Sequence, residues 1–224
     1  MIIAIDGPSG AGKSTLGRLL ARELKLLYID TGAMYRAAAL AVIESGVSTT
    51  NDEEVARVVK QADISLEGDP DSLQVLLDGQ DVSRKIRTEE VSHSSSVIST
   101  IPEVRRSLVE RQREMGRRAG GVVLDGRDIG TVVFPEADVK FFLTAAPEER
   151  AQRRYEEDRL KERDATFEET LADINTRDRR DSTRQDSPLV PAADAIQIDS
   201  TGLTIEEVFG QMMEAIRERG LRDF

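Results

Sequence analysis

The chain has 224 residues and a formal net charge of −11, from 31 basic and 42 acidic side chains. This acidic balance argues against broad nucleic-acid binding, which depends on a basic surface. The lack of cysteine and the single histidine exclude a disulfide framework and a metal site built from thiolate or several imidazole ligands. No apolar run has the length of a membrane span or the form of a signal peptide, so we expect a cytoplasmic protein without membrane or nucleic-acid partners.

The first motif is a short apolar run, residues 2–6, followed by Gly7-Pro8-Ser9-Gly10-Ala11-Gly12-Lys13-Ser14. The spacing G-x-x-x-x-G-K-S is that of a phosphate-binding P-loop. Glycines let the backbone approach a phosphate closely, and consecutive N–H groups point into the loop. Lys13 supplies a charge to the β- and γ-phosphates, and the Ser14 hydroxyl is a ligand for Mg²⁺. The complete pattern favours a nucleoside triphosphate site over an ordinary Gly-rich turn.

Strands alternate with helices along most of the chain. Buried strands are expected at residues 2–6, 26–29, 122–125, 139–143 and 195–198. Helices are expected at residues 13–25, 33–45, 51–61, 88–98 and 102–118, in two pieces within 148–186, and from residue 204 onward. This alternation predicts an α/β fold of the P-loop NTPase type, in three layers around a central parallel sheet. Ligands of such folds bind beyond the carboxyl ends of the strands.

The segment 63–84 departs from this alternation. It contains three short strand-like runs, residues 64–66, 74–77 and 80–82, and the hairpin signal Asp78-Gly79. We therefore expect a small antiparallel β-insert at 63–84. The core domain would consist of residues 1–62 and 85–224.

Charged residues follow two of the buried strands. Asp30 ends the second strand and leads to Tyr35-Arg36, and Asp125-Gly126-Arg127-Asp128 ends a later one. Both corners lie in the ligand zone of the predicted fold. Further arginines gather between residues 150 and 184: Arg150, Arg153, Arg154, Arg159, Arg177, Arg179, Arg180 and Arg184. They fit either a site for a phosphorylated acceptor or solvated helix faces with i, i+4 ion pairs.

P-loops occur in switches, motors, transporter ATPases and small-molecule kinases. The chain lacks the Asn-Lys-x-Asp motif with which GTPases read guanine, and it lacks the further motifs of motors and transporters. Arginines near strand ends favour a kinase whose acceptor already carries a phosphate. The non-enzyme alternative is an ATP-bound regulatory protein, which would give the arginines near the strand ends no functional role.

Five segments together resemble the bacterial cytidylate kinases, a family of P-loop nucleoside monophosphate kinases. They are the P-loop, Asp30-Thr31-Gly32-Ala33-Met34-Tyr35-Arg36, Ile86-Arg87-Thr88-Glu89-Glu90-Val91, Asp125-Gly126-Arg127-Asp128-Ile129-Gly130-Thr131 and Leu189-Val190-Pro191-Ala192-Ala193-Asp194. The resemblance covers nearly the whole chain. It implies transfer of the γ-phosphoryl group of Mg·ATP to CMP or dCMP, which gives ADP and CDP or dCDP. A P-loop kinase for another small phosphorylated or hydroxylated acceptor is the alternative.

The resemblance assigns residues to each substrate. It implies that ATP binds the P-loop and one later arginine: Gly7, Pro8, Ser9, Gly10, Ala11, Gly12, Lys13, Ser14, Thr15 and Arg154. It implies that CMP binds both strand-end corners and the later helices: Thr31, Tyr35, Arg36, Ser96, Arg105, Asp125, Arg127, Asp128, Arg177, Asp181 and Arg184. Four of these residues are expected to be catalytic: Lys13, Arg127, Asp128 and Arg184. Ser14 is the expected ligand of Mg²⁺.

Within the CMP site, the resemblance implies a division by chemical role. The acceptor phosphate would be held by Arg36, Arg127 and Arg184. The cytosine edge would be read by Ser96, Arg105 and Asp128, and the sugar would contact Arg177 and Asp181. Base reading also follows from chemistry, because a carboxylate accepts from the cytosine amino group and faces a repelling carbonyl in uracil.

The resemblance also implies two mobile parts around the core. The insert at 63–84 would be the monophosphate-binding subdomain, and a helical lid near 150–166 would close over the site. Thr31 stands where the family commonly has serine, and Ser14 where the P-loop often has glycine or threonine. Both keep or add a hydroxyl group. A monomer is expected, because no long apolar stripe is left over.

Overall fold

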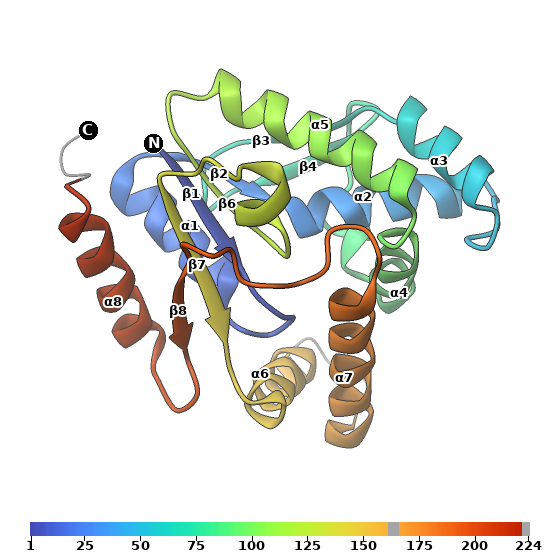
Figure 1. Ribbon diagram of the computed structural model, residues 1–224. Coiled ribbons are helices and arrows are strands. Elements are labelled where there is room, and N and C mark those ends of the chain that lie inside the picture. The colour runs from blue at the N-terminus through green and yellow to red at the C-terminus, as the bar shows by residue number, and fades with distance from the viewer. Residues whose placement is uncertain (161–165, 221–224) are drawn as a thin grey trace. The chain divides into compact units, whose positions relative to one another are not determined.

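The computed structural model describes residues 1–160 and 166–220 (Figure 1). The chain divides into two compact units: unit 1 consists of Met1–Leu26 and Val123–Phe224, and unit 2 of Leu27–Val122. No helix among the described residues is both long and apolar enough to cross a membrane.

The central sheet has five strands in the order β2 (Leu27–Asp30), β6 (Val122–Gly126), β1 (Ile2–Asp6), β7 (Val139–Thr144) and β8 (Ile196–Asp199). β7 pairs in parallel with both β1 and β8, so that Phe141 lies opposite Ile5 and Ile196. The strands β1, β6 and β7 are almost continuously buried. Such unbroken apolar runs are typical of parallel strands that are covered on both faces. The predicted α/β fold with a central parallel sheet is confirmed.

The described part of unit 1 also contains four α-helices and one short π-helix: α1 (Lys13–Leu24), α6 (Pro147–Leu160), α7 (Phe167–Thr183), α8 (Ile205–Glu218) and η2 (Ile129–Val133). α1 packs against α8, and α6 packs along α7. The helices α7 and α8 begin with capping boxes, in which Thr166 pairs with Glu169 and Thr204 with Glu207. The second of these boxes confirms the helix start that the sequence predicted.

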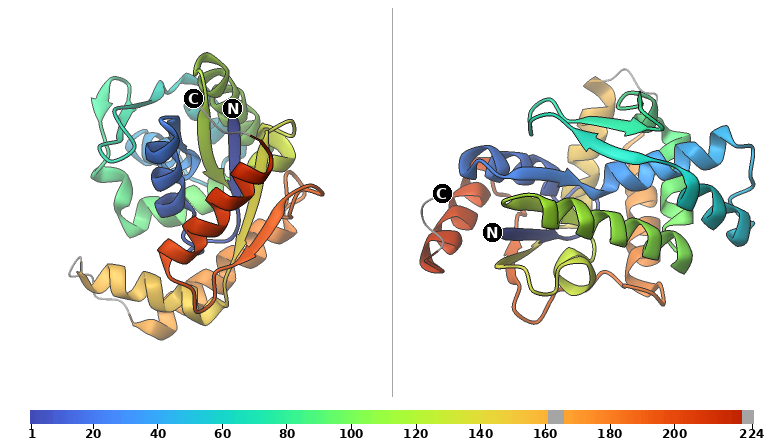
Figure 2. Two further views of the ribbon diagram at one scale, coloured as in Figure 1. Left: turned by 90° about the vertical axis from the view of Figure 1, so that its left-hand side faces the viewer. Right: turned by 90° about the horizontal axis from the view of Figure 1, so that it is seen from above.

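Unit 2 is built around a long helix, α2 (Thr31–Glu44). The other elements of this unit are α3 (Asp52–Gln61), β3 (Ile64–Glu67), β4 (Gln74–Leu77), β5 (Gln80–Asp81), η1 (Lys85–Arg87), α4 (Glu89–Ile98) and α5 (Pro102–Arg118). α2 packs against α3 and α4, and the strands β3 and β4 run along it (Figure 2). The three short strands form an antiparallel sheet in the order β3-β4-β5. The predicted antiparallel strands of the insert are therefore present.

The turn between β4 and β5 explains why this hairpin could be read from the sequence. Asp78 and Gly79 have φ angles of 50° and 76°, and they connect the paired residues Leu77 and Gln80. Two consecutive positive φ angles define the type I′ turn that suits the twist of a two-residue hairpin. Asp-Gly is a preferred sequence for this turn.

Gly7, the first residue after β1, is required by a close approach of two backbones. Its φ angle is +148°, and a Cβ atom at this position would lie 2.1 Å from the carbonyl oxygen of Leu143 in β7. The P-loop therefore leaves the sheet at a point where no side chain fits.

We expect Gly7→Ala to lower the free energy of unfolding by about 2–5 kcal/mol, because it adds backbone strain to a steric conflict. Gly46→Ala is the matched control, since Gly46 also has a positive φ angle, +70°, but nothing within 4 Å of the added Cβ. The control should lose only about 1–2 kcal/mol. Urea unfolding of both variants measures the difference, and equal losses would contradict the close approach at Leu143.

Candidate active site

The loop between β1 and α1 has the geometry of a phosphate cradle. Gly10 and Gly12 have φ angles of 78° and 90°, in the left-handed region that glycine adopts readily. Gly12 is the N-cap of α1, and no side chain caps the first N–H groups of this helix. Uncapped N–H groups at a helix N-terminus that follows a Gly-rich turn are suited to bind a phosphate.

Lys13 folds back across this loop. Its Nζ atom donates a hydrogen bond of 2.6 Å to the carbonyl oxygen of Pro8. Burial, and then the nearby Arg127, lower the pKa of Lys13 to about 7, against the opposing effect of Asp125, Asp181 and Asp6. The ammonium group is therefore held in a site where added negative charge stabilises its protonated form.

Ser14 connects the loop to β6. Its hydroxyl group donates a 2.7 Å hydrogen bond to Oδ2 of Asp125, a buried residue near the carboxyl end of that strand. A hydroxyl and a carboxylate oxygen are the ligands that Mg²⁺ prefers. No cluster of three or more His, Cys, Asp or Glu side chains able to hold a metal occurs within 1–160 and 166–220. This pair fits Mg²⁺, which is usually held by one or two carboxylates together with substrate phosphates.

Four predicted site residues lie together in unit 1: Arg127, Asp128, Asp181 and Arg184. Arg127 Nε donates to Asp181 Oδ2 at 2.7 Å. The Nη2 atom of Arg184 lies 3.8 Å from Oδ1 of Asp128, and its Nη1 atom lies 4.0 Å from Oδ1 of Asp181. The side chains of Asp128, Asp181 and Arg184 are almost fully buried. The sequence thus identified a real cluster of alternating charges.

The charges of this cluster support one another. Burial opposes the ionised form of Asp181, but Arg127 and then Arg184 outweigh it and lower the pKa of the carboxyl group. Burial likewise opposes the charge of Arg127, but Asp181, Asp125 and Asp178 outweigh it and raise the pKa of the guanidinium. Both side chains are therefore ionised at neutral pH.

Two further predicted arginines pair with acidic residues on their own helices. Arg154 Nε donates to Asp158 Oδ2 at 3.2 Å on α6, and Arg177 Nε lies 3.1 Å from Asp173 Oδ2 on α7. Burial, and then the nearby cations Arg154 and Arg127, lower the pKa of Arg177, while Asp173 opposes this shift. Arg177 therefore lies within the electrostatic reach of the cluster, whereas Asp158, the partner of Arg154, lies on α6 and not in the P-loop.

In unit 2, the corner after β2 is organised by a carboxylate. Asp30 caps α2, because one of its oxygens accepts a 2.7 Å hydrogen bond from the N–H group of Ala33. The other oxygen accepts from Nη2 of Arg36 at 3.4 Å. Thr31 is the first residue of α2 and is buried. Asp30 thus orients Arg36 through a hydrogen bond, and Thr31 begins the helix that Asp30 caps.

The remaining predicted residues of unit 2 lie on α2, α4 and α5. The guanidinium of Arg105 stacks 5.6 Å from the ring centroid of Tyr35, and its Nη1 atom donates to the carbonyl oxygen of Ser99. Only 2% of Arg105 is exposed. Ser96 lies on α4, which packs against α2. Tyr35 and Arg105 are therefore in direct contact, as expected of residues that share a site.

Asp6, the last residue of β1, was not among the site residues predicted from the sequence. Its two carboxylate oxygens accept 2.8 Å hydrogen bonds from the N–H groups of Ile129 and Gly130, which begin the helix after Arg127 and Asp128. Burial raises the pKa of Asp6 to about 6, and Asp128 adds to this shift, while the two backbone donors and Lys13 oppose it. A carboxylate at the end of a buried strand is the signal that singled out Asp30 and Asp125, so the same rule could have found Asp6.

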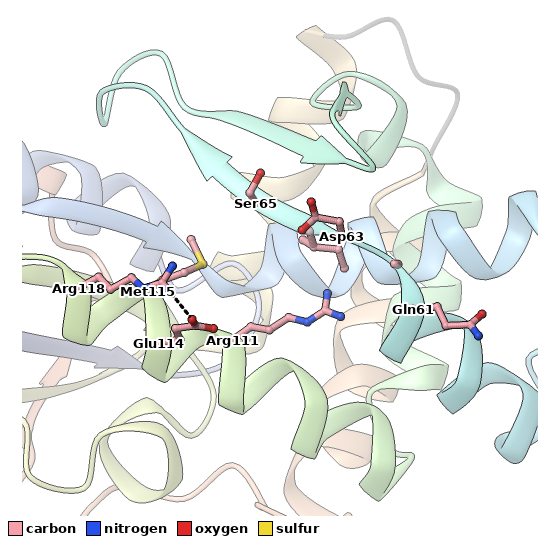
Figure 3. A pocket seen from close by; sticks show the side chains of 9 residues that line it. Gln61, Asp63, Ser65, Arg111, Glu114, Met115 and Arg118 are labelled. Atoms are coloured by element: carbon pink, nitrogen blue, oxygen red, sulfur yellow. Dashed lines mark ion pairs between the residues drawn. The ribbon is translucent and has the colours of Figure 1, made fainter.

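A pocket of about 400 Å³ in unit 2 contains none of the predicted site residues (Figure 3). It lies among the end of α3, β3 and α5. Arg111 donates from α5 to the carbonyl oxygens of Val59 and Lys60 near the end of α3, and Arg118 pairs with Glu114 along α5. These charges satisfy a helix end and a surface ion pair, so we do not include this pocket in the candidate site.

Comparison with known proteins decides the family. The model of the cytidylate kinase family matches residues 3–218. The chain belongs to the cytidylate kinase family. Relatives named cytidylate kinase include a protein of Geobacter sp. (strain M21), 51% identical over 219 residues that cover 98% of this chain and 94% of the relative. Another is from Bacillus subtilis (strain 168), 46% identical over 97% of this chain and 96% of the relative. The resemblance predicted from the motifs is confirmed.

A solved structure supports the fold at low identity. The crystal structure of an uncharacterized protein from Eubacterium ventriosum matches with a TM-score of 0.53 and 11% sequence identity, over 97% of this chain and 98% of that one. A match at this identity concerns the fold alone.

Asp6 predicts a specific pH dependence of stability. The pKa of its carboxyl group is higher in the folded chain, about 6, than the ordinary value of 3.8, so the folded state binds more protons between these values. Stability from this group is therefore present at low pH and is lost as the pH rises through about 6. Between pH 4.5 and 7.5, the wild type should lose about 2 kcal/mol relative to Asp6→Asn, which cannot ionise.

Denaturant unfolding of both proteins at several pH values measures this difference. Asp199→Asn at the end of β8 is the control, because hydrogen bonds from Thr201 lower the pKa of this exposed carboxyl group. Asp199 is largely ionised across the window in both states, so the wild type and this control should differ by a nearly constant amount. A constant difference for Asp6→Asn as well would contradict the raised pKa.

Proposed function

We propose that the protein transfers the γ-phosphoryl group of ATP to the 5′-phosphate of CMP or dCMP, which gives ADP and CDP or dCDP. Its family is one of ATP-dependent nucleoside monophosphate kinases. The observation that carries the proposal is a pair of interacting cations in unit 1, the buried Lys13 and the partly buried Arg127: burial, and then Arg127, lower the pKa of Lys13. Two cations so placed are suited to bind phosphate groups that repel one another in solution.

On the donor side, we assign the triphosphate of ATP to the loop and helix start from Gly7 to Thr15. The backbone N–H groups of this segment and the Lys13 ammonium neutralise the phosphate oxygens. Ser14 and Asp125 would hold Mg²⁺, which would supply positive charge to the phosphate groups. Arg154 is still expected to contact ATP. Its side chain would have to break its hydrogen bond to Asp158 before it could reach the nucleotide.

On the acceptor side, Arg127 changes partner. The 5′-phosphate of CMP competes with Asp181 for its guanidinium, since both ligands accept paired N–H bonds. Asp181 then accepts from a sugar hydroxyl group, and Arg177 donates to a sugar oxygen. Arg184 and Arg36 complete the contacts to the phosphate.

The cytosine base is assigned to residues of complementary hydrogen-bonding type. Asp128 accepts from the amino group, while Arg105 and Ser96 donate to ring acceptors. Thr31, Tyr35 and Asp125 complete the expected CMP contacts. The stacking of Arg105 on Tyr35 fixes the guanidinium before the base binds.

Catalysis in this proposal comes from positioning and charge neutralisation. The acceptor phosphate is already ionised, so no strong general base is needed. The segment near 150–166 acts as a lid, of which residues 161–165 lie outside the described part of the chain, and the insert 63–84 closes over the monophosphate. Their closure excludes water from the transferred group.

Two alternatives make different predictions. A P-loop kinase for another small acceptor is not favoured, because the family model and the relatives carry the name cytidylate kinase. An ATP-binding regulatory protein would bind ATP without turnover. We further infer a monomer in the cytoplasm, where its nucleotide substrates are found.

The acceptor preference tests the proposal. In an assay of ADP release, CMP and dCMP should be phosphorylated with a kcat/KM roughly fivefold to 160-fold above that for UMP, because uracil places a carbonyl against Asp128 at a cost of about 1–3 kcal/mol. AMP should be a poor acceptor as well. Lys13→Ala is the control and should show no turnover with any acceptor. Equal rates with CMP, UMP and AMP would leave only a generic kinase.

A further inference from the structure

Arg150 makes three hydrogen bonds that join separate parts of unit 1. It lies in the first turn of α6, and only 3% of its side chain is exposed. Its Nε atom donates to the carbonyl oxygen of Ala145 at 2.9 Å, and its Nη1 atom to that of Ser9 at 3.0 Å. Its Nη2 atom donates to Asp178 Oδ2 at 2.6 Å. One buried guanidinium thus bridges the P-loop, the start of α6 and α7.

The bond to Ser9 fixes the direction of a donor in the P-loop. A trans peptide holds its C=O and N–H groups on opposite sides. When Arg150 binds the carbonyl oxygen of Ser9, the N–H group of Gly10 is directed away from α6. Gly10 also packs directly on Arg150, because an added Cβ would lie 3.0 Å from Cβ of Arg150. The loop and the first turn of α6 are therefore joined by a hydrogen bond and by direct packing.

The hydrogen bond from Arg150 to Asp178 connects the P-loop and the start of α6 to α7. Asp178 lies on α7, between Arg177 and Arg179, and one turn before Asp181. Its second oxygen, Oδ1, is buried and has no hydrogen-bond partner among the residues that the structure describes. The carboxylate is therefore oriented by Arg150 alone. It also acts electrostatically on Arg127, whose pKa it helps to raise.

We propose that Arg150 is a positioning residue through which occupation of the P-loop by ATP strengthens the binding of CMP to α7. The proposal rests on the assignment of Arg177, Asp181 and Arg184 to CMP. A phosphate bound by the loop fixes the Ser9–Gly10 peptide, which fixes the guanidinium of Arg150 and hence Asp178 and the rotation of α7. Arg150 does not touch either substrate in this scheme, because its donors are directed to protein oxygens.

Arg153 supplies a matched control on the same helix. Its Nη1 and Nη2 atoms donate to Oγ and to the carbonyl oxygen of Ser200, at 3.1 and 2.7 Å. It is also partly buried, with 29% of its side chain exposed. Arg153 thus ties α6 to the segment after β8, and not to the P-loop or to α7.

The test measures the coupling between the two nucleotides. The Kd of CMP is determined by calorimetric titration, without and with a saturating Mg²⁺ complex of an ATP analogue whose β- and γ-phosphates are joined by nitrogen. The ratio of the two values is the coupling factor. We expect a factor of at least about fivefold for the wild type. Arg150→Lys, which retains the charge but not the three-way fork, should bring it to within about twofold of one.

Further variants separate coupling from folding. Asp178→Asn, at a side chain that is 27% exposed, should reduce the factor similarly, and the double variant should lose no more than either single variant because the interaction is shared. Arg153→Lys should keep the wild-type factor. Thermal unfolding checks that each variant is folded. If Arg150→Lys is not folded, the coupling factor of Asp178→Asn decides the test.

Three results would overturn the proposal. A folded Arg150→Lys variant with the wild-type coupling factor would show that Arg150 is merely structural. A wild type that binds both nucleotides with a factor of one would exclude the coupling and leave the proposed function intact. A wild type that binds the ATP analogue but not CMP would overturn the proposed function together with the coupling.

Discussion

The site depends on keeping a buried lysine within electrostatic reach of a partly buried arginine. Burial, and then repulsion by Arg127, lower the pKa of Lys13 to about 7, even though Asp125, Asp181 and Asp6 oppose the shift. The carboxylates make this arrangement stable enough to fold. The negative phosphate groups of the substrates compensate the remaining positive charge of Lys13 and Arg127. For this reason the two cations can bind the phosphates tightly and neutralise charge during transfer.

The fold supplies the carboxylates at fixed positions. Asp6 and Asp125 lie at the carboxyl ends of β1 and β6, where parallel strands deliver side chains to one edge of the sheet. Asp6 holds the backbone that follows Arg127 and Asp128, and Asp125 holds Ser14. Asp181 comes from α7, whose position is fixed in turn by Arg150 through Asp178. A helix that lies outside the sheet is thereby connected to the phosphate-binding loop.

Much of this could be predicted from the sequence because local signals are strong. The P-loop spacing, the apolar strands, the Asp78-Gly79 turn and the Thr204–Glu207 cap each depend on a few neighbouring residues. Arg177, Asp181 and Arg184 are likewise spaced four and seven residues apart, so a helix over this segment places them on one face.

The interactions that were missed join distant parts of the chain. The hydrogen bond of Asp6 to Ile129 spans 123 positions, and that of Arg150 to Ser9 spans 141. Such pairs depend on strand order and on how the helices pack, which composition and spacing do not encode. The helix η2 was also missed: its π-type turn is closed by backbone hydrogen bonds from Val133 to Asp128 and from Phe134 to Ile129, which no apolar repeat in the sequence indicates.

The exchange of partners at Arg127 is the central claim, and a crystal structure with CMP and an unreactive ATP analogue tests it most directly. We predict that a phosphate oxygen of CMP lies within hydrogen-bond distance of the Arg127 guanidinium, that Asp181 has turned from Arg127 to the sugar, and that the triphosphate lies in the loop from Gly7 to Ser14. A structure in which Arg127 still binds Asp181, while the CMP phosphate is held elsewhere, would contradict the account.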